Sequence, residues 1–298
     1  MATNSLSGVN LAQISREAID YLGSQFFPVN LFTSNFSKDI ATKGESVTTR
    51  IVSGFTSQDV SGGYSTNAQN AVTTAVTTSL SNFKGVPIEI KDAEVSKAGN
   101  RDWLMKNFYR PLAEATIKSL VDDLLALVTN ANYSNKTTQA VGGFDADVLA
   151  DIGGALTTRK VATDRRAMLL SPTYHAALAK DSALHDISSS RDPAVIIDNR
   201  VKRARGFDVF EYDAIPGNSE NLVGFGCGRS ALVIAARPVY QPEIPSVKIE
   251  QMTEPNTGLP FQFRLWYSTD NGCWYLSGGF LYGVSVGQSA ALQRIVSA

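Results

Sequence analysis

The sequence predicts an α+β fold, and three patterns lead to that class. Apolar residues recur at helical spacing over 101–131, two stretches within 44–92 alternate apolar and polar residues, and 246–296 reads as strands and turns. The order along the chain is therefore a ribbon, a long helix, a mixed α/β unit and a β tail.

The composition limits the function before any motif is considered. The 298 residues are 43% hydrophobic and 18% charged, and the net charge is -1. Proteins that hold nucleic acid mainly through its phosphates are usually much more basic, so tight DNA binding is not expected to be the main role. No secretory signal and no apolar run of about 20 residues is found, so neither export nor a membrane span is expected.

The N-terminal segment, residues 1–43, is expected to form an arm. A short amphipathic helix is predicted over 11–22. A run of aromatic residues follows it, interrupted by Pro28: Phe26, Phe27, Phe32 and Phe36. Two interpretations stay open, in which these rings pack on their own domain or on a neighbouring subunit.

Residues 44–92 are predicted to form an extended two-stranded ribbon. Period-2 alternation runs through 47–52 and again through 86–91, which favours pairing of these two stretches. Pro87, which has no amide hydrogen to donate, is expected on an edge or at a position that donates no ladder hydrogen bond.

Between those stretches, residues 56–82 contain a single charged residue, Asp59, and a tandem AVTT repeat at 71–78. Loops of this length are uncommon unless they are functional or disordered. We favour an arm that docks on a neighbouring subunit over a disordered loop. Its candidate contact residues are Val60, Tyr64, Val72 and Val76.

The strongest helix pattern covers 101–131, with a wide apolar face. Its main apolar stripe has i+4 steps and comprises Leu104, Phe108, Leu112, Leu120, Leu124 and Val128. Pro111 is expected to kink this helix or to mark its true start.

The remaining chain is predicted as a mixed α/β unit over 144–237 and a β tail. Ser171 is expected to cap a helix that has Pro172 in its first turn, after a buried strand at 167–170. In the tail, Asp270-Asn271-Gly272 is a strong hairpin signal.

A search for catalytic chemistry finds no phosphate-binding loop, zinc-protease, nucleophile-elbow or CxxC motif. His175 and His185 have no nearby thiolate and make a poor zinc site. We therefore expect no catalytic residue, cofactor or metal. The alternative from another class is a cytoplasmic α/β enzyme that uses His175 or the acids Asp145 and Asp147.

Two basic clusters stand out: Arg159, Lys160, Arg165 and Arg166, and then Arg200, Lys202, Arg203 and Arg205. They would suit either nucleic acid phosphates or acids across a subunit interface. The net charge of -1 favours the interface.

The order of these segments resembles the HK97-like major capsid proteins of tailed double-stranded DNA phages, closest to the P22 coat-protein-like branch. The resemblance covers most of the chain. It rests on LAQISREAIDYLGSQFFPVNLF, the ribbon, RDWLMKNFYRPLAEATIKSLVDDLLALV, RAMLLSPTYHAALAK and TGLPFQFRLWYSTDNGCWYLSGGFLYGVSV. It implies these parts: an N-terminal arm (1–43), an E-loop ribbon (44–92), a peripheral domain with the spine helix (93–143), an axial domain (144–237) and peripheral strands (238–298).

The resemblance also implies a function and a set of partners. The chain would assemble into hexamers and pentamers of an icosahedral shell, in the host cytoplasm and then in the virion capsid. Partners would be a separate scaffolding protein, a portal protein and packaged DNA, held weakly and non-specifically, with room for a decoration or cement protein. An encapsulin-like nanocompartment shell is the alternative with the same fold.

Overall fold

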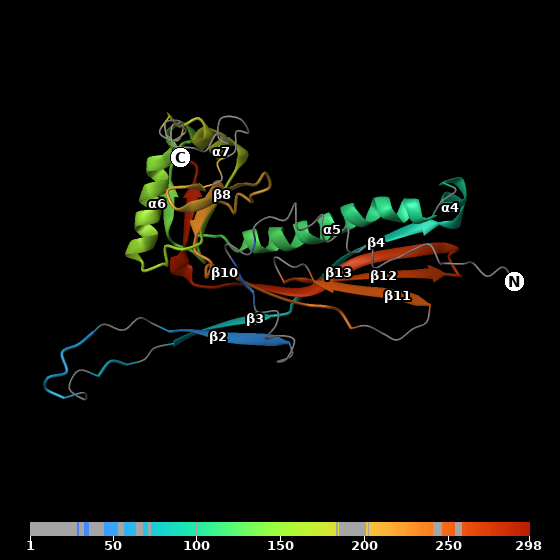
Figure 1. Cartoon of the computed structure of the whole chain (residues 1–298), viewed down its shortest axis with the longest axis horizontal. Coiled ribbons are helices and arrows are strands. Elements are labelled where there is room, and N and C mark those ends of the chain that lie inside the picture. Colours follow the sequence, from blue (N-terminus) through green and yellow to red (C-terminus); the bar gives the residue numbers. More distant parts are fainter. Residues whose placement is uncertain are drawn as a thin grey trace.

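The computed structural model describes residues 29, 33–35, 45–52, 57–63, 68–70, 73–98, 101–182, 184, 201, 203–240, 246–253 and 258–298. Within these residues the chain forms two six-stranded sheets and a two-stranded ribbon. A long helix lies along one face of the first sheet, and the ribbon lies on its other side (Figure 1).

The first sheet carries the β tail. Its order is β1 (Thr33–Asn35), β10 (Leu232–Arg237), β13 (Cys273–Val286), β12 (Pro260–Ser268) and β11 (Val247–Thr253), and β4 (Asn82–Lys91) pairs with β13. The predicted hairpin turn joins β12 to β13, and Gly272 in it has φ of +59°, which glycine adopts without strain. Pro87 lies in β4, whose described pairing is with β13 alone, so of the two predicted positions the edge is the one observed.

The long helix α5 (Arg101–Ala126) follows a short helix, α4 (Asp92–Ala98). Leu112, Leu120 and Leu124 are at most 1% exposed, as the predicted apolar face requires. Pro111 is exposed and lies inside α5. Because the helix begins ten residues earlier, at Arg101, Pro111 does not mark its start. A methyl group on Gly278 of β13 would collide with Leu112, so this glycine allows the helix to lie directly on the sheet.

The second sheet has the order β5 (Lys136–Thr138), β14 (Leu292–Val296), β9 (Leu222–Cys227), β6 (Arg166–Leu170), β8 (Phe207–Glu211) and β7 (Arg203–Ala204). The segments that connect these strands contain the helices α6 (Ala146–Thr158) and α7 (Pro172–Ala179) and two 3-10 turns, η1 (Val141–Gly143) and η3 (Ser289–Ala291). Every residue of β6 is buried, as predicted for this strand.

The start of α7 differs in one detail from the prediction. Ser171 occupies the N-cap position and Pro172 the first turn, but the Ser171 side chain makes no capping hydrogen bond to the helix backbone. Its hydroxyl instead lies 3.2 Å from the Thr173 hydroxyl, which competes for the same oxygen.

The predicted pairing of the ribbon strands is wrong. The first strand, β2 (Ser46–Val52), pairs with β3 (Thr73–Ser79), with Thr49 opposite Val76. The stretch 86–91 belongs to β4 in the first sheet, where Ile90 is 2% exposed. Burial of its apolar residues in the core stabilises this stretch in the first sheet. The threonine-rich repeat therefore provides β3, the second strand of the ribbon.

Sheet membership does not follow the predicted segment boundaries. Strand β10, within the predicted unit 144–237, joins the first sheet, and β14, within 238–298, joins the second. The domain boundaries themselves stay a prediction. None of the described helices is long and apolar enough to span a bilayer.

Candidate inter-subunit surfaces

The ribbon is attached to the body by a small contact at its base. Val47 and Leu80 pack with Ala235 and Leu281 of the first sheet in a cluster separate from the main core. The Thr78 and Ser285 hydroxyls lie 2.5 Å apart. Nearby, a methyl group on Gly283 of β13 would collide with the Ser79 carbonyl, so the ribbon backbone lies directly on β13.

Beyond its base the ribbon extends away from the body, past the end of the molecule that carries the second sheet (Figure 1). The described residues 57–63 are all exposed, and Val60 is 44% exposed. A turn closes there, in which the Gly63 amide donates to the Val60 carbonyl at 2.9 Å. The Ser61 amide donates to the Asp59 carboxylate and lowers the pKa of Asp59.

The ribbon has one face that is more apolar than the other. Val47 shares a face with its partner Thr78 and with Val76, two residues along β3, because cross-strand partners point to the same side. At the base this face is buried against the body, as the 4% exposure of Val47 shows. Farther out, Val76 is half-buried.

The structure places four of the predicted contact residues. Val60 and Val76 lie on the ribbon, and Arg203 and Arg205 lie at β7 and the turn after it. The others fall outside the described residues: Phe26, Phe27, Phe32, Phe36, Tyr64, Val72, Arg200 and Lys202.

Arg203 and Arg205 both approach acids of their own chain. Arg203 Nε lies 3.8 Å from Asp208, and an Arg205 terminal nitrogen lies 3.4 Å from Asp147. The two arginine side chains are 71% and 43% exposed, so each pair contributes little to stability. Both guanidinium groups are therefore accessible at the surface, and their contact with another subunit stays a prediction.

The other basic cluster contains two arginines that support the fold. The buried Arg166 guanidinium donates to the carbonyls of Ala162, Gly153 and Val161, at 2.7 to 2.9 Å. Arg159 donates to Gln293 of β14 at 2.8 Å. Burial lowers the pKa of both arginines. These two side chains brace the C-terminal end of α6 against the second sheet.

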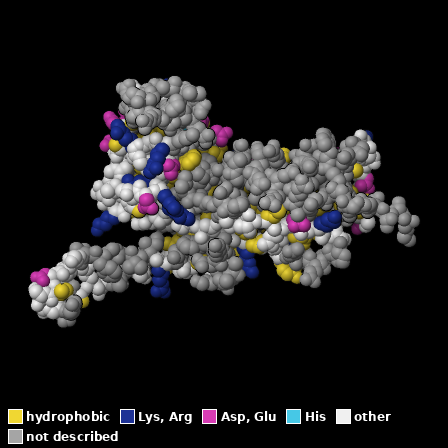
Figure 2. Space-filling model, in the orientation of Figure 1, with side chains coloured by type: hydrophobic (Ala, Val, Ile, Leu, Met, Phe, Trp, Pro, Cys, Tyr) yellow, Lys and Arg dark blue, Asp and Glu magenta, His cyan; other side chains and the backbone are white. Residues whose placement is uncertain are grey.

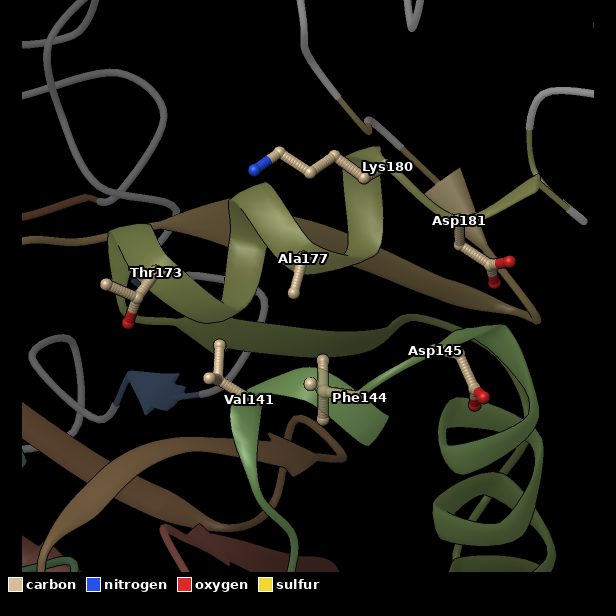
Figure 3. Close-up of a pocket in the computed structure, with 8 residues that line it drawn as sticks. Val141, Phe144, Asp145, Thr173, Ala177, Lys180 and Asp181 are labelled. Carbon is tan, nitrogen blue, oxygen red and sulfur yellow. The ribbon is translucent and has the colours of Figure 1, made fainter.

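The acids of the enzyme alternative do not converge on a site. Asp145 caps α6 by accepting from the Asp147 and Val148 amides, both at 3.1 Å. Asp181 accepts from the Ala146 amide at 2.8 Å. Asp145 and Asp181 line one end of an open hollow of about 470 Å³ between η1 and α7, and the Lys180 amine points away from them (Figure 3).

His175 lies outside that hollow's lining. Its ring is buried, and its Nδ1 lies 3.5 Å from the Glu211 carboxylate. Across the residues that the structure describes, no three His, Cys, Asp or Glu side chains are grouped to hold a metal.

A buried cluster at the end of α5 was not predicted from the sequence. Arg294 of β14 is 0% exposed, forms an ion pair with Glu220, and donates to the Tyr133 carbonyl at 2.6 Å and to Asn130 Oδ1 at 2.7 Å. Asn218 donates to the carbonyls of residues 125 and 128, at 3.1 and 2.7 Å. The turn 217–221 thus ties the helix end to the second sheet.

A second polar cluster connects α5 to the first sheet. Asp123 accepts from the Lys84 amine at 2.7 and 2.9 Å, from Asn82 at 3.2 Å and from the Tyr282 hydroxyl at 2.6 Å. The hydrogen bond with Asp123 raises the pKa of Lys84. Lys84 therefore faces the helix and not the ribbon.

Comparison with known proteins shows which solved structures share this fold. No family model and no curated protein matches this chain. Solved structures do match: the asymmetric unit of the bacteriophage PhiM1 mature capsid has a TM-score of 0.62 at 11% identity, over 92% of this chain and 87% of that chain. A structure from Mycobacterium phage Che8 has a TM-score of 0.61 at 18% identity, over 89% of both chains.

A virus-like particle from Pyrococcus furiosus also matches, with a TM-score of 0.52 at 11% identity, over 96% of this chain and all of that one. Together with the long helix on one sheet, the second sheet and the projecting ribbon, these matches define the class: the chain has the HK97-like fold of phage capsid proteins. The closer likeness to the P22 coat-protein-like branch stays a prediction.

Proposed function

We propose that this chain is the major capsid protein of a tailed double-stranded DNA phage. It assembles with copies of itself into hexamers and pentamers of an icosahedral shell. The observation that carries this proposal is the HK97-like fold together with a ribbon that extends far from its own body. A ribbon of two strands is marginally stable alone in water, so its extension is best understood as a contact made in an assembly.

The partners follow from the same role. A separate scaffolding protein directs assembly, a portal protein replaces one capsomer, and the outer surface has room for a decoration or cement protein. Packaged DNA is held weakly and non-specifically, in keeping with the net charge of -1. The role is structural, located in the virion capsid after assembly in the host cytoplasm, and it requires no catalytic residue.

The test is electron microscopy and sedimentation of the purified chain, expressed alone and together with the scaffolding gene from its own gene neighbourhood. Closed, regular shells are expected in at least one of the two preparations. Monomers or small irregular aggregates in both preparations would contradict the proposal.

A protein nanocompartment that encloses a cargo protein is the second candidate, and the match to the Pyrococcus furiosus virus-like particle favours it. The gene neighbourhood separates the two candidates. Portal and terminase genes beside this gene support the phage capsid, whereas a cargo enzyme gene in their place supports the nanocompartment.

A further inference from the structure

The turn between β12 and β13 places an asparagine directly before a glycine. Asn271 is exposed, and the ladder between the two strands ends at the pair of Ser268 with Cys273, so the turn lies outside it. In an Asn-Gly pair the backbone nitrogen of the glycine can attack the side-chain carbonyl carbon of the asparagine, because glycine has no side chain to block the approach. Asparagine is accordingly one of the chemically labile residues of proteins.

The attacking nitrogen is free of the hydrogen bonds that hold this turn. Within the described part of the chain the Gly272 amide donates no hydrogen bond, whereas its carbonyl accepts from the Asp92 amide at 3.1 Å. A backbone N–H that is already hydrogen-bonded would have to give up that bond before its nitrogen attacks. The turn therefore holds the glycine by its carbonyl and leaves its nitrogen available.

The leaving group lies beside a hydroxyl that can supply a proton. Asn271 Nδ2 lies 3.1 Å from the Tyr275 hydroxyl oxygen and donates to it. This distance is within the reach of about 2.6 to 3.2 Å that proton transfer to a reacting group requires. Once the attacked carbon becomes tetrahedral, the leaving nitrogen gains a lone pair, and the Tyr275 hydroxyl is then placed to donate to it.

The Tyr275 hydroxyl is held in position by the first sheet. Tyr275 pairs with Trp266 of β12 and with Glu89 of β4, so its strand has a neighbour on both sides. Its ring also stacks on the Trp266 ring, with 5.3 Å between ring centres. A proton donor is most effective when packing fixes its position before the reaction begins, and these contacts provide that packing.

Two other asparagines of the described chain are protected by their contacts. Asn218 Nδ2 donates to the carbonyls of residues 125 and 128, at 3.1 and 2.7 Å. Asn132 Nδ2 donates to the carbonyl of residue 127 at 2.8 Å. Carbonyl oxygens have no proton to give to a leaving nitrogen. Of these three asparagines, Asn271 is the one with a glycine after it and a proton donor at its side-chain nitrogen.

We propose that Asn271 is a self-modification site of this protein. The Gly272 nitrogen attacks Asn271 Cγ and loses its proton to water. The bond from Cγ to Nδ2 then breaks as Tyr275 donates its proton, so that ammonia leaves and a cyclic succinimide forms. Water opens the succinimide to aspartate or isoaspartate, and Tyr275 regains a proton from solvent. The net reaction consumes one water and releases one ammonia.

The product changes the charge and the backbone at this end of the molecule. It adds one carboxylate to a chain whose net charge is -1, near the acidic side chains that Figure 2 shows at the end that carries α4. Isoaspartate also routes the main chain through the former side chain, which lengthens the turn by one methylene. The hydrogen bond between the Gly272 carbonyl and the Asp92 amide, at the start of α4, is then displaced. This inference does not depend on the proposed capsid function.

The test incubates the purified full chain in mildly alkaline buffer made with H₂¹⁸O and then digests it with trypsin in ordinary water. Water that opens the succinimide leaves ¹⁸O in the product, so modification of the folded chain is separated from modification during digestion. Peptide 265–294 contains Asn271 as its one asparagine, and peptide 206–229 contains Asn218 and Asn221. Mass spectrometry follows both peptides over time, and fragmentation distinguishes isoaspartate from aspartate.

Tyr275→Phe is the main variant, because it keeps the ring that stacks on Trp266 and removes only the hydroxyl. Tyr267→Phe is the matched control: it removes a hydroxyl from the same hairpin, one that contacts Asp92 and not Asn271. Melting curves verify that the compared chains are folded. We expect ¹⁸O to enter the Asn271 peptide at similar rates in wild type and Tyr267→Phe, and at least about tenfold more slowly in Tyr275→Phe.

The proposal would be overturned by the absence of ¹⁸O from the wild-type peptide 265–294, or by labelling of Asn218 as fast as that of Asn271. A wild-type rate in Tyr275→Phe, or an equal loss of rate in Tyr267→Phe, would overturn it as well. The comparison with Asn218 is made within the wild-type chain, so it decides the matter even where a variant fails to fold.

Discussion

At the residue scale, the buried Arg294 is the most demanding side chain in the structure. A fully buried guanidinium is tolerated when its charge is paired and its N–H groups have acceptors, and Glu220, Tyr133 and Asn130 provide these partners. The same residues join β14 to the end of α5. The ion pair therefore contributes to the stability of this junction, together with the hydrogen bonds from Asn218 to the end of α5.

Replacement of Glu220 by Gln tests that contribution, because it leaves the Arg294 charge buried without its carboxylate. We expect the free energy of unfolding to fall by about 3 kcal/mol, measured by urea denaturation of the unassembled subunit. The matched control is Asp208→Asn, which breaks the exposed pair with Arg203 and should cost less than about 1 kcal/mol. Equal losses for the two variants would contradict the role of burial.

A second prediction at the residue scale concerns Tyr282 and the dependence of stability on pH. Burial, with a smaller effect of the hydrogen bond to Asp123, raises the pKa of Tyr282 from 10.0 to about 12. Between these values the unfolded chain loses the tyrosine proton while the folded chain keeps it. The unfolded state then binds fewer protons, so stability falls as pH rises through this window and is fully present below pH 10.

Thermal melting of wild type and Tyr282→Phe from pH 9 to pH 12 checks this expectation. The melting temperature of wild type should fall more steeply above pH 10 than that of the variant, which has no proton to lose at this position. Parallel curves would show that Tyr282 ionises as readily in the folded chain as in the unfolded one.

At the scale of elements, the ribbon and the body differ in how many core contacts stabilise them. The body is held by a continuous core, whereas the ribbon base has one small cluster and the Thr78–Ser285 hydrogen bond. The outer ribbon contributes little to the core of its own subunit. It should therefore be removable without unfolding the rest.

Replacement of residues 57–70 by an Asn-Gly turn is the corresponding experiment. It keeps β2, β3 and the buried Leu80, which a longer deletion through residue 80 would remove. We expect a soluble subunit with the wild-type melting temperature that forms no shells in electron micrographs. An insoluble product, or shells of normal appearance, would show that the outer ribbon is not an assembly element.

At the scale of the whole molecule, the question is how subunits are held together. In some HK97-like capsids an isopeptide bond joins an E-loop lysine to an asparagine of another subunit. This chain has no lysine between Lys43 and Lys84, and Lys84 is held by Asp123 beside α5. The outer ribbon thus offers no amine for that bond, and contacts between subunits should be non-covalent.

Boiling mature particles in detergent and separating the chains on a gel measures this directly. A single band at the chain mass of 32.0 kDa is expected, with and without reductant. Cys227 and Cys273 are both buried, so they should not form bonds between intact subunits. A ladder of dimers through hexamers that survives reductant would contradict the prediction.

Local patterns in the sequence were sufficient for several parts of this molecule. The helical spacing of Leu112, Leu120 and Leu124 predicted α5, and Asp270-Asn271-Gly272 predicted the β12–β13 hairpin, because both signals act over a few residues. The fold class, the order of segments and the resemblance to HK97-like capsids followed from such signals. The absence of a lysine in the outer ribbon also needed no coordinates.

Strand partners and buried polar clusters were decided by the tertiary structure alone. Alternation shows that 47–52 and 86–91 are strands, but it does not show with which strand each of them pairs. The first pairs with β3 and the second with β13. These partners depend on contacts between segments that are far apart in the sequence. The partners of Arg294 lie 74 to 164 residues away in the chain, and no local pattern brings them together.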